Sequence, residues 1–174
     1  MAGKKMDMGP SGETVADNIK RVREARRWTY TELSKRLTDL GRSVSPLAVR
    51  RIEERERRVD VDDLVAFAIA LEVTPKTLLM PYSESMEDIV GITGGVDERA
   101  GVINAWMTGE AQLPHQSGTQ WIEFMALAAP AWRYKEIAAV VRGVRVVNSL
   151  DDLRARQTGE LPGPREAGQL NGDD

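Results

Sequence analysis

The chain has 174 residues, of which 41% are hydrophobic and 29% charged, as in an ordinary folded protein. It has no cysteine and one histidine, His115, so disulfides and thiolate metal sites are excluded and histidine-based catalysis has at most one imidazole. No run approaches the roughly 20 apolar residues that cross a bilayer, and no apolar segment follows Lys4 and Lys5 as in a signal peptide. We therefore expect a cytoplasmic protein without a membrane partner.

Charge is distributed unevenly along the chain. Between Ile19 and Arg58 there are 13 lysines and arginines against 6 acidic residues, a local charge of +7. After Met80 the count is 8 against 14, a charge of −6. A basic segment in a chain of net charge −3 indicates a surface for a polyanion on the first part only. Charge alone leaves open the alternative that these side chains only solvate helices.

Apolar periodicity predicts a series of short helices after a disordered leader at residues 1–12. The predicted helices run from about Thr14 to Ala25, from Thr31 to Leu40, from Pro46 to about Glu54, from Val61 to Leu71, and from Pro75 to Leu79. Ser45 before Pro46 is a strong helix start, because serine caps the first turn and proline needs no amide partner there. Gly41 ends the second helix, since glycine tolerates left-handed geometry.

The second half is predicted to be mostly helical over residues 82–157 and disordered over 158–174. A short strand is predicted at 89–93, a polar loop at 109–118, and helices at 97–107, 121–129, 133–142 and 149–152. Trp106, Trp121, Phe124 and Trp132 concentrate apolar mass there, which forms either a small helical core or a dimer interface. The fold class expected for the whole chain is all-α.

The segment from Tyr30 to Leu37 and the segment from Ser45 to Glu53, joined by a turn, resemble the lambda-repressor-like (XRE-type) helix-turn-helix family. The resemblance covers residues 14 to 80 and extends to the later segments Val59–Leu64 and Ala70–Leu79. It implies a five-helix DNA-binding domain over residues 13–81, followed by a small, mostly helical region for dimerisation or partner binding.

In this family the third helix enters the major groove and the second crosses the DNA backbone. The resemblance therefore implies base-reading roles for Arg51, Arg50, Leu47, Ala48 and Pro46. Arg51 is the first candidate to read a guanine, through two hydrogen bonds to O6 and N7. Arg50 contacts either a base or a phosphate, and Leu47 and Ala48 pack on thymine methyl groups.

The expected phosphate-binding residues lie at the helix starts and in the loops, where backbone amides or arginines reach the DNA. They are Ser45, Tyr30, Thr31, Arg42, Arg55, Arg57 and Arg58. Each arginine has the alternative role of a solvated charge. Arg23 and Glu53 match a pair that forms an internal salt bridge in relatives, and the resemblance implies that they join the first helix to the third.

Two features depart from the family pattern. The connection at residues 38–44 is about five residues longer than the shortest form in the family, so the turn reaches the DNA differently. Arg55 stands where relatives usually have glycine, two residues after the glutamate, so the third helix is expected to end less sharply.

The function expected from these residues is a sequence-specific regulator of transcription that binds a double-stranded DNA operator. We expect a nucleoid-associated homodimer, a repressor of host or prophage type, with no cofactor and no metal. An enzyme is not expected, because no nucleophile–base pair occurs and Gly91–Gly95 lacks the lysine of a phosphate-binding loop. The alternative is an antitoxin-like interaction protein that masks a protein partner with its C-terminal half and also autoregulates through DNA.

Overall fold

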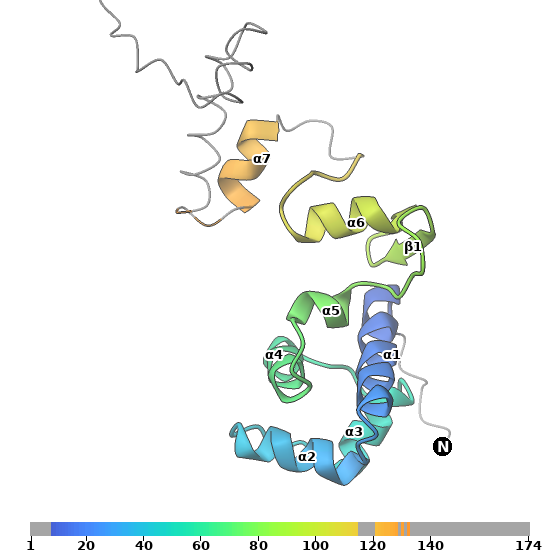
Figure 1. The fold of residues 1–174 in the computed structure, drawn as a ribbon, viewed down its shortest axis with the longest axis vertical. Helices are drawn as coiled ribbons and strands as arrows, with labels where there is room; N and C mark the ends of the chain where they lie inside the picture. The colour runs from blue at the N-terminus through green and yellow to red at the C-terminus, as the bar shows by residue number, and fades with distance from the viewer. Residues whose placement is uncertain (1–7, 115–120, 129, 131, 133–174) are drawn as a thin grey trace, which may run out of the picture. The chain divides into compact units, whose positions relative to one another are not determined.

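The computed structural model describes residues 8–114, 121–128, 130 and 132, and divides into one unit up to Trp121 and another from Ile122 (Figure 1). Its described part is mostly helical. The elements are α1 (Pro10–Ala25), α2 (Tyr30–Asp39), α3 (Pro46–Glu53), α4 (Val61–Ala70), α5 (Pro75–Leu79), β1 (Ile89–Ile92), β2 (Val96–Arg99), α6 (Ala100–Met107) and α7 (Trp121–Ala128). The predicted helices at 133–142 and 149–152 and the predicted tail at 158–174 lie outside the described residues.

The first helix, α1, begins at Pro10, four residues before the predicted start at Thr14. Residues 10–12 are therefore helical and not part of a disordered leader. Proline is suited to the first helical position, because its φ angle is already helical and it has no amide to satisfy. The apolar stripe could not reveal this turn, since Pro10–Glu13 carries no large apolar side chain.

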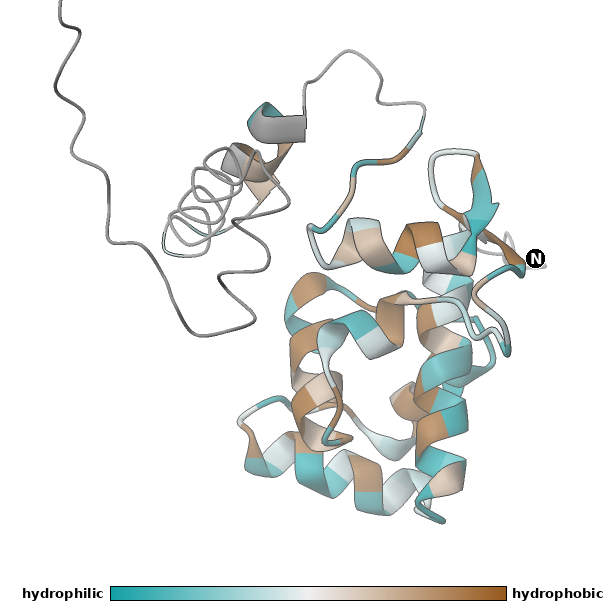
Figure 2. Cartoon of the chain, turned by 45° about the horizontal axis from the view of Figure 1, so that its top comes forward, coloured by the Kyte–Doolittle hydropathy of each residue, from teal (hydrophilic) through white to brown (hydrophobic). Residues whose placement is uncertain are grey.

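A single apolar core joins α1 to α5, and hydropathy colouring shows the apolar residues turned toward one another between these helices (Figure 2). The largest side chains with no exposed surface are Ile19, Leu33, Leu37, Ile52, Phe67, Leu71 and Leu78. They come from all five helices at helical spacing, as the sequence pattern predicted. Val44, in the connection between α2 and α3, is also buried and fixes that connection to the core.

Four helices of this region end in the same way, with a residue at positive φ directly after the last helical turn. Gly41 has φ +80° after α2, whereas Arg27, Arg55 and Glu72 have φ from +54° to +59° after α1, α3 and α4. At the end of α3 the amides of Arg55 and Glu56 donate to Ile52 O (2.9 Å) and Arg51 O (2.8 Å), which closes the helix. The expectation that α3 ends less sharply without glycine is wrong, although an arginine in this conformation costs about 1 kcal/mol.

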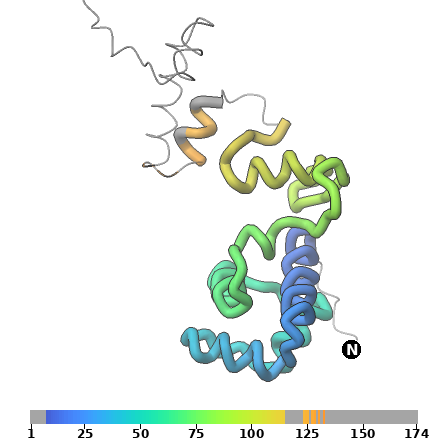
Figure 3. The backbone as a smooth tube through the Cα atoms, viewed as in Figure 1, coloured from blue at the N-terminus to red at the C-terminus, as the bar shows by residue number. Residues whose placement is uncertain are grey.

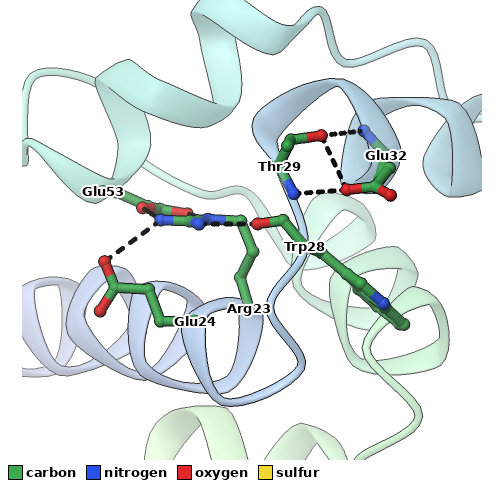
Figure 4. A network of polar contacts seen from close by, with 6 residues as sticks. All are labelled: Arg23, Glu24, Trp28, Thr29, Glu32 and Glu53. Atoms are coloured by element: carbon green, nitrogen blue, oxygen red, sulfur yellow. Dashed lines mark hydrogen bonds and ion pairs between the residues drawn. The ribbon is translucent and has the colours of Figure 1, made fainter.

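The buried ion pair between Arg23 of α1 and Glu53 of α3 joins these helices (Figure 4). Arg23 Nε and Nη2 each donate to a Glu53 carboxylate oxygen at 2.7 Å, and Nη1 donates to Trp28 O at 2.9 Å. The two side chains are only 9% and 1% exposed. The hydrogen bond to Glu53 raises the pKa of Arg23 above its ordinary value. The pair therefore holds α1, the α1–α2 turn and α3 in one arrangement.

A capping box begins α2. The amide of Glu32 donates to Thr29 Oγ1 at 3.2 Å, and Glu32 Oε2 accepts from the Thr29 amide at 2.6 Å and from its hydroxyl at 2.8 Å. The hydrogen bond from the Thr29 amide, followed by that from the hydroxyl, lowers the pKa of Glu32 below its ordinary value. The cap therefore contributes when Glu32 is ionised.

A two-stranded antiparallel hairpin follows α5 and corrects the all-α expectation. β1 pairs with β2 in a register that places Ile92 opposite Val96, and Gly94 and Gly95 turn the chain with φ +108° and +71°. The predicted helix at 97–107 therefore starts only at Ala100, because residues 97–99 belong to β2. The hairpin and α6 share a second core of Val90, Ile92, Ala100, Ile103 and Leu113.

The hairpin is attached to the start of α1, as the ribbon shows (Figure 1). Ser11 and Thr93 exchange two hydrogen bonds: the Thr93 amide donates to Ser11 Oγ at 2.9 Å and the Ser11 amide donates to Thr93 Oγ1 at 3.3 Å. The hairpin is thus fixed to the helical domain through side chains far apart in the sequence.

Glu53→Gln is expected to lower the free energy of unfolding by about 3 kcal/mol, because it leaves the buried Arg23 guanidinium without a counter-charge. The matched control is Glu54→Gln, whose side chain is 41% exposed, and its effect is expected to stay below about 1 kcal/mol. Urea unfolding followed by far-ultraviolet circular dichroism measures both. Equal losses in the two variants would show that the pair does not hold the domain together.

The pKa of Glu32 is expected to rise toward the ordinary glutamate value in Thr29→Ala, because the hydroxyl donor is removed. Since the folded-state pKa of Glu32 is lowered, its contribution to stability is complete above the unfolded-state pKa and is lost as the pH falls through the folded-state pKa. Titration of the side-chain carboxyl carbon by nuclear magnetic resonance measures the shift. An unchanged titration midpoint in the variant would contradict the assigned cause.

Candidate nucleic-acid interface

The helix α3 has one buried face and one exposed face. Val49 and Ile52 are completely buried on the inner face. On the outer face Leu47 is 55% exposed, the Arg50 side chain is 57% exposed, and Arg51 is also exposed. Pro46 is exposed and Ala48 half-buried at the start of the helix. Spacing along an eight-residue helix thus places the predicted base-reading side chains on the solvent side of this unit.

Ser45 caps the start of α3, as its residue type predicts. Ser45 Oγ accepts a hydrogen bond from the Ala48 amide at 3.2 Å, and Pro46 has no amide. Within the described residues the Leu47 amide has no hydrogen-bond acceptor, and Ser45 keeps its hydroxyl proton for a further partner. The donors available at this helix start are therefore one amide and one hydroxyl, fewer than the group of amides expected from the sequence.

The start of α2 lies beside α3. The Tyr30 and Thr31 amides occupy the first turn of α2, and in the described part of the chain neither has an acceptor. The ring of Tyr30 lies under the Arg23 guanidinium, whose carbon is 4.5 Å from the ring centre. The same guanidinium holds Glu53 of α3, so Arg23 joins the start of α2 to α3.

The two arginines on the outer face of α3 differ in their partners. Arg50 Nε donates to Glu54 Oε1 at 2.8 Å, one helical turn away, and this hydrogen bond raises the pKa of Arg50. Arg51 has no carboxylate within ion-pair distance among the residues that the structure describes. Arg51 therefore keeps all its donors for an external acceptor, whereas Arg50 is held in one orientation.

Arg42 and Arg57 are engaged by the start of α4. Arg42 Nε donates to Asp63 Oδ1 at 2.6 Å, and its Nη2 contacts Asp60 Oδ2 at 3.0 Å. Arg57 Nη2 lies 3.4 Å from Asp63 Oδ2. Asp63 is buried, and its hydrogen bond is the main reason that the pKa of Arg42 is raised. The long connection between α2 and α3 is thus fixed to the start of α4. Figure 3 traces the backbone through these helices.

Arg55 is engaged by α1, and its Nη1 and Nη2 contact Glu13 Oε2 at 3.0 Å and Asp17 Oδ2 at 2.7 Å. Arg58 is exposed in the segment before α4. No local pattern in the sequence predicts these acidic partners. Asp60 and Asp63 also suit the start of a helix, and their match to Arg42 becomes visible only in the fold.

Within the described ranges, no group of three or more His, Asp or Glu side chains is arranged to hold a metal ion. Among those same residues, no helix combines the length and the apolar character needed to cross a membrane.

The comparisons with known proteins agree with the geometry of this surface. Residues 19–78 match a family model described as helix-turn-helix, of the XRE or lambda-repressor-like type. This segment spans α2, α3 and α4 completely, and it includes the last seven residues of α1 (19–25) and the first four of α5 (75–78). No curated protein and no solved structure matches the chain. Residues 19–78 therefore match a helix-turn-helix domain of the lambda-repressor-like type, a family of DNA-binding domains found in transcription regulators.

Proposed function

We propose that this protein is a sequence-specific repressor that inserts α3 into the major groove of a double-stranded DNA operator. The observation that carries the proposal is the solvent-facing Arg51, whose donors have no acceptor among the described residues. A helix of this width fits the major groove, and residues near its start reach the base edges. The helix-turn-helix match over residues 19–78 supports the same interpretation.

In this proposal different residues of α3 contact different groups of the DNA. Arg51 reads a guanine through two hydrogen bonds to O6 and N7, because a guanidinium matches these two acceptors. Leu47, with Ala48 and Pro46 beside it, contacts thymine methyl groups. Arg50 contacts a base or a phosphate in the orientation that Glu54 gives it.

The backbone of the DNA is held from two helix starts. The open amides of Tyr30 and Thr31, and the Leu47 amide with the Ser45 hydroxyl, each present donors to a phosphate. The carboxylates that engage Arg42, Arg55 and Arg57 favour a positioning role for these arginines. Each still keeps a partly exposed guanidinium near the DNA-facing loops, so phosphate contacts by Arg42, Arg55, Arg57 and Arg58 remain part of the proposal.

We also propose that the protein binds its operator as a homodimer. The eight residues of α3 span about 12 Å, which covers roughly four base pairs at 3.4 Å each. Four base pairs are too few to specify one operator, so two copies on adjacent half-sites are needed. Selection of bound fragments from random DNA should give a palindromic motif. A one-to-one complex with a different small protein, in place of the dimer, would favour the antitoxin-like alternative.

Arg51→Ala is expected to weaken binding to the selected operator by about 1–3 kcal/mol, or roughly five- to 150-fold, and to relax the preference for guanine at one position. Lys35→Ala is the matched control, because Lys35 is an exposed cation on α2 outside the proposed contact surface. Fluorescence anisotropy with the operator and with scrambled DNA measures both variants. Unchanged affinities of Arg51→Ala for both DNAs would overturn the assigned role.

Arg50→Gln distinguishes the two proposed roles of Arg50. If Arg50 contacts a phosphate, the variant weakens binding equally for operator and scrambled DNA, and the slope of log affinity against log salt falls by about 0.9. If Arg50 reads a base, the loss is confined to the operator. Affinities measured at several salt concentrations separate the two outcomes, and no change in any of these quantities would remove Arg50 from the interface.

A further inference from the structure

A hollow of about 440 Å³ lies where the helix-turn-helix domain meets the segment that follows it. Its walls come from α1, α5, the connection after α5, and α6, which Figure 1 shows around this junction. Its lining includes Arg21, Lys76, Tyr82, Met86, Gly101 and Asn104. The volume is within the range of small-molecule sites in proteins.

Two cations face this hollow, and their hydrogen bonds go to neutral oxygens. Lys76 Nζ donates to Asn104 Oδ1 at 2.5 Å. Arg21 Nε and Nη2 donate to Asn18 Oδ1 at 3.1 and 3.0 Å. Across the described part of the chain, neither cation has a carboxylate within ion-pair distance. An amide oxygen does not neutralise a charge, so neither positive charge is compensated by its hydrogen-bond partner.

Among the described residues Arg21 and Lys76 share this lack of a carboxylate with Lys20, Lys35 and Arg51, and they differ in it from most arginines of the same unit. Eight arginines there have at least one carboxylate within 4.0 Å, namely Arg23, Arg26, Arg36, Arg42, Arg50, Arg55, Arg57 and Arg99. Acidic residues are therefore abundant around the domain, yet they leave Arg21 and Lys76 without a counter-charge. Glu84 also lines the hollow, so its lining keeps a charge of +1 from these three residues. Such a site favours an anion.

Hydrogen bonds within the protein fix the residues around the hollow in the absence of a ligand. The buried Asn18 side chain donates from Nδ2 to Leu78 O at 3.1 Å and to Met80 O at 2.8 Å, and its Oδ1 holds Arg21. At the start of α6 the amides of Ala100 and Gly101 donate to Asp88 O and Met86 O at 2.8 and 2.9 Å. These two amides are therefore occupied, and the positive charge of the lining comes from Arg21 and Lys76. A preformed arrangement lowers the entropy cost of binding.

Two exposed side chains bring apolar surface to the lining of the hollow. Tyr82 is 65% exposed and Met86 is 69% exposed. The Arg21 guanidinium carbon lies 5.1 Å from the centre of the Tyr82 ring, so the ring and the cation are adjacent. A ligand that fits these neighbours has an anionic group next to a flat apolar body.

We propose that this hollow binds a small aromatic anion, a carboxylate or a phosphate ester. Its charged group contacts Lys76 and Arg21, and its ring lies against Tyr82 and Met86. The proposal goes beyond DNA binding and does not depend on it, because the ligand binds the chain in the absence of DNA. Failure of either proposal leaves the other intact.

The experiment titrates the full chain with phenyl phosphate and with benzoate, by calorimetry and by amide chemical shifts. Saturable binding of at least one of them at a single site is expected, with shifts in residues 76–86 and 100–104, and the comparison shows which anionic group is preferred. Phenol, which has the ring without the charge, is expected to bind at least tenfold more weakly. No saturable binding of either anion, or equal binding of phenol, would overturn the proposal.

Variants locate the site. Lys76→Gln and Arg21→Gln are each expected to weaken binding at least tenfold, and Lys76→Arg to retain most of it. Lys20→Gln is the matched control, because Lys20 is an exposed cation next to Arg21 that does not line the hollow. Tyr82→Ala removes an exposed ring and is expected to weaken binding severalfold without unfolding the chain. Unchanged affinities in the Lys76, Arg21 and Tyr82 variants would place the ligand elsewhere.

Discussion

The buried pair between Arg23 and Glu53 is the interaction on which the arrangement of the DNA-binding domain depends. Burying two charged groups costs free energy unless their hydrogen-bonding atoms have partners. Here both carboxylate oxygens and three guanidinium nitrogens have partners. Because the pair joins α1 to α3 and also engages the α1–α2 turn, the position of α3 is set by directional bonds as well as by apolar packing. A helix that reads base edges needs such a fixed position.

Around this pair, the basic surface of the domain separates into arginines that have a carboxylate and cations that do not. Arg42 and Arg55 hold the two loops that flank α3, through Asp63 and through Asp17. Arg51, by contrast, is left for an external acceptor. The positive charge of the segment therefore divides between arginines such as Arg42, Arg55 and Arg57, which hold loops, and cations such as Arg51, which have no carboxylate among the described residues.

Local sequence signals predicted much of this fold. The caps at Ser45, Asp60 and Thr74 are formed as their residue types suggest, because a cap depends on neighbours three residues away. The hairpin was missed in part, since Asp97 and Glu98 of β2 stand directly before the apolar residues of α6 and so also suit the acidic first turn of a helix. Ion pairs such as Arg55 with Asp17 could not be predicted at all, because their partners are 38 residues apart and meet only in the folded chain.

The helix α1 carries attachments to two separate parts of this unit. Its 16 residues extend about 24 Å, with the Ser11–Thr93 attachment at one end and Arg23 near the other. The helix therefore links the hairpin to α3, through the Ser11–Thr93 hydrogen bonds at one end and the Arg23–Glu53 ion pair near the other. The position of the hairpin and the position of the exposed face of α3 are thus set by contacts of the same helix.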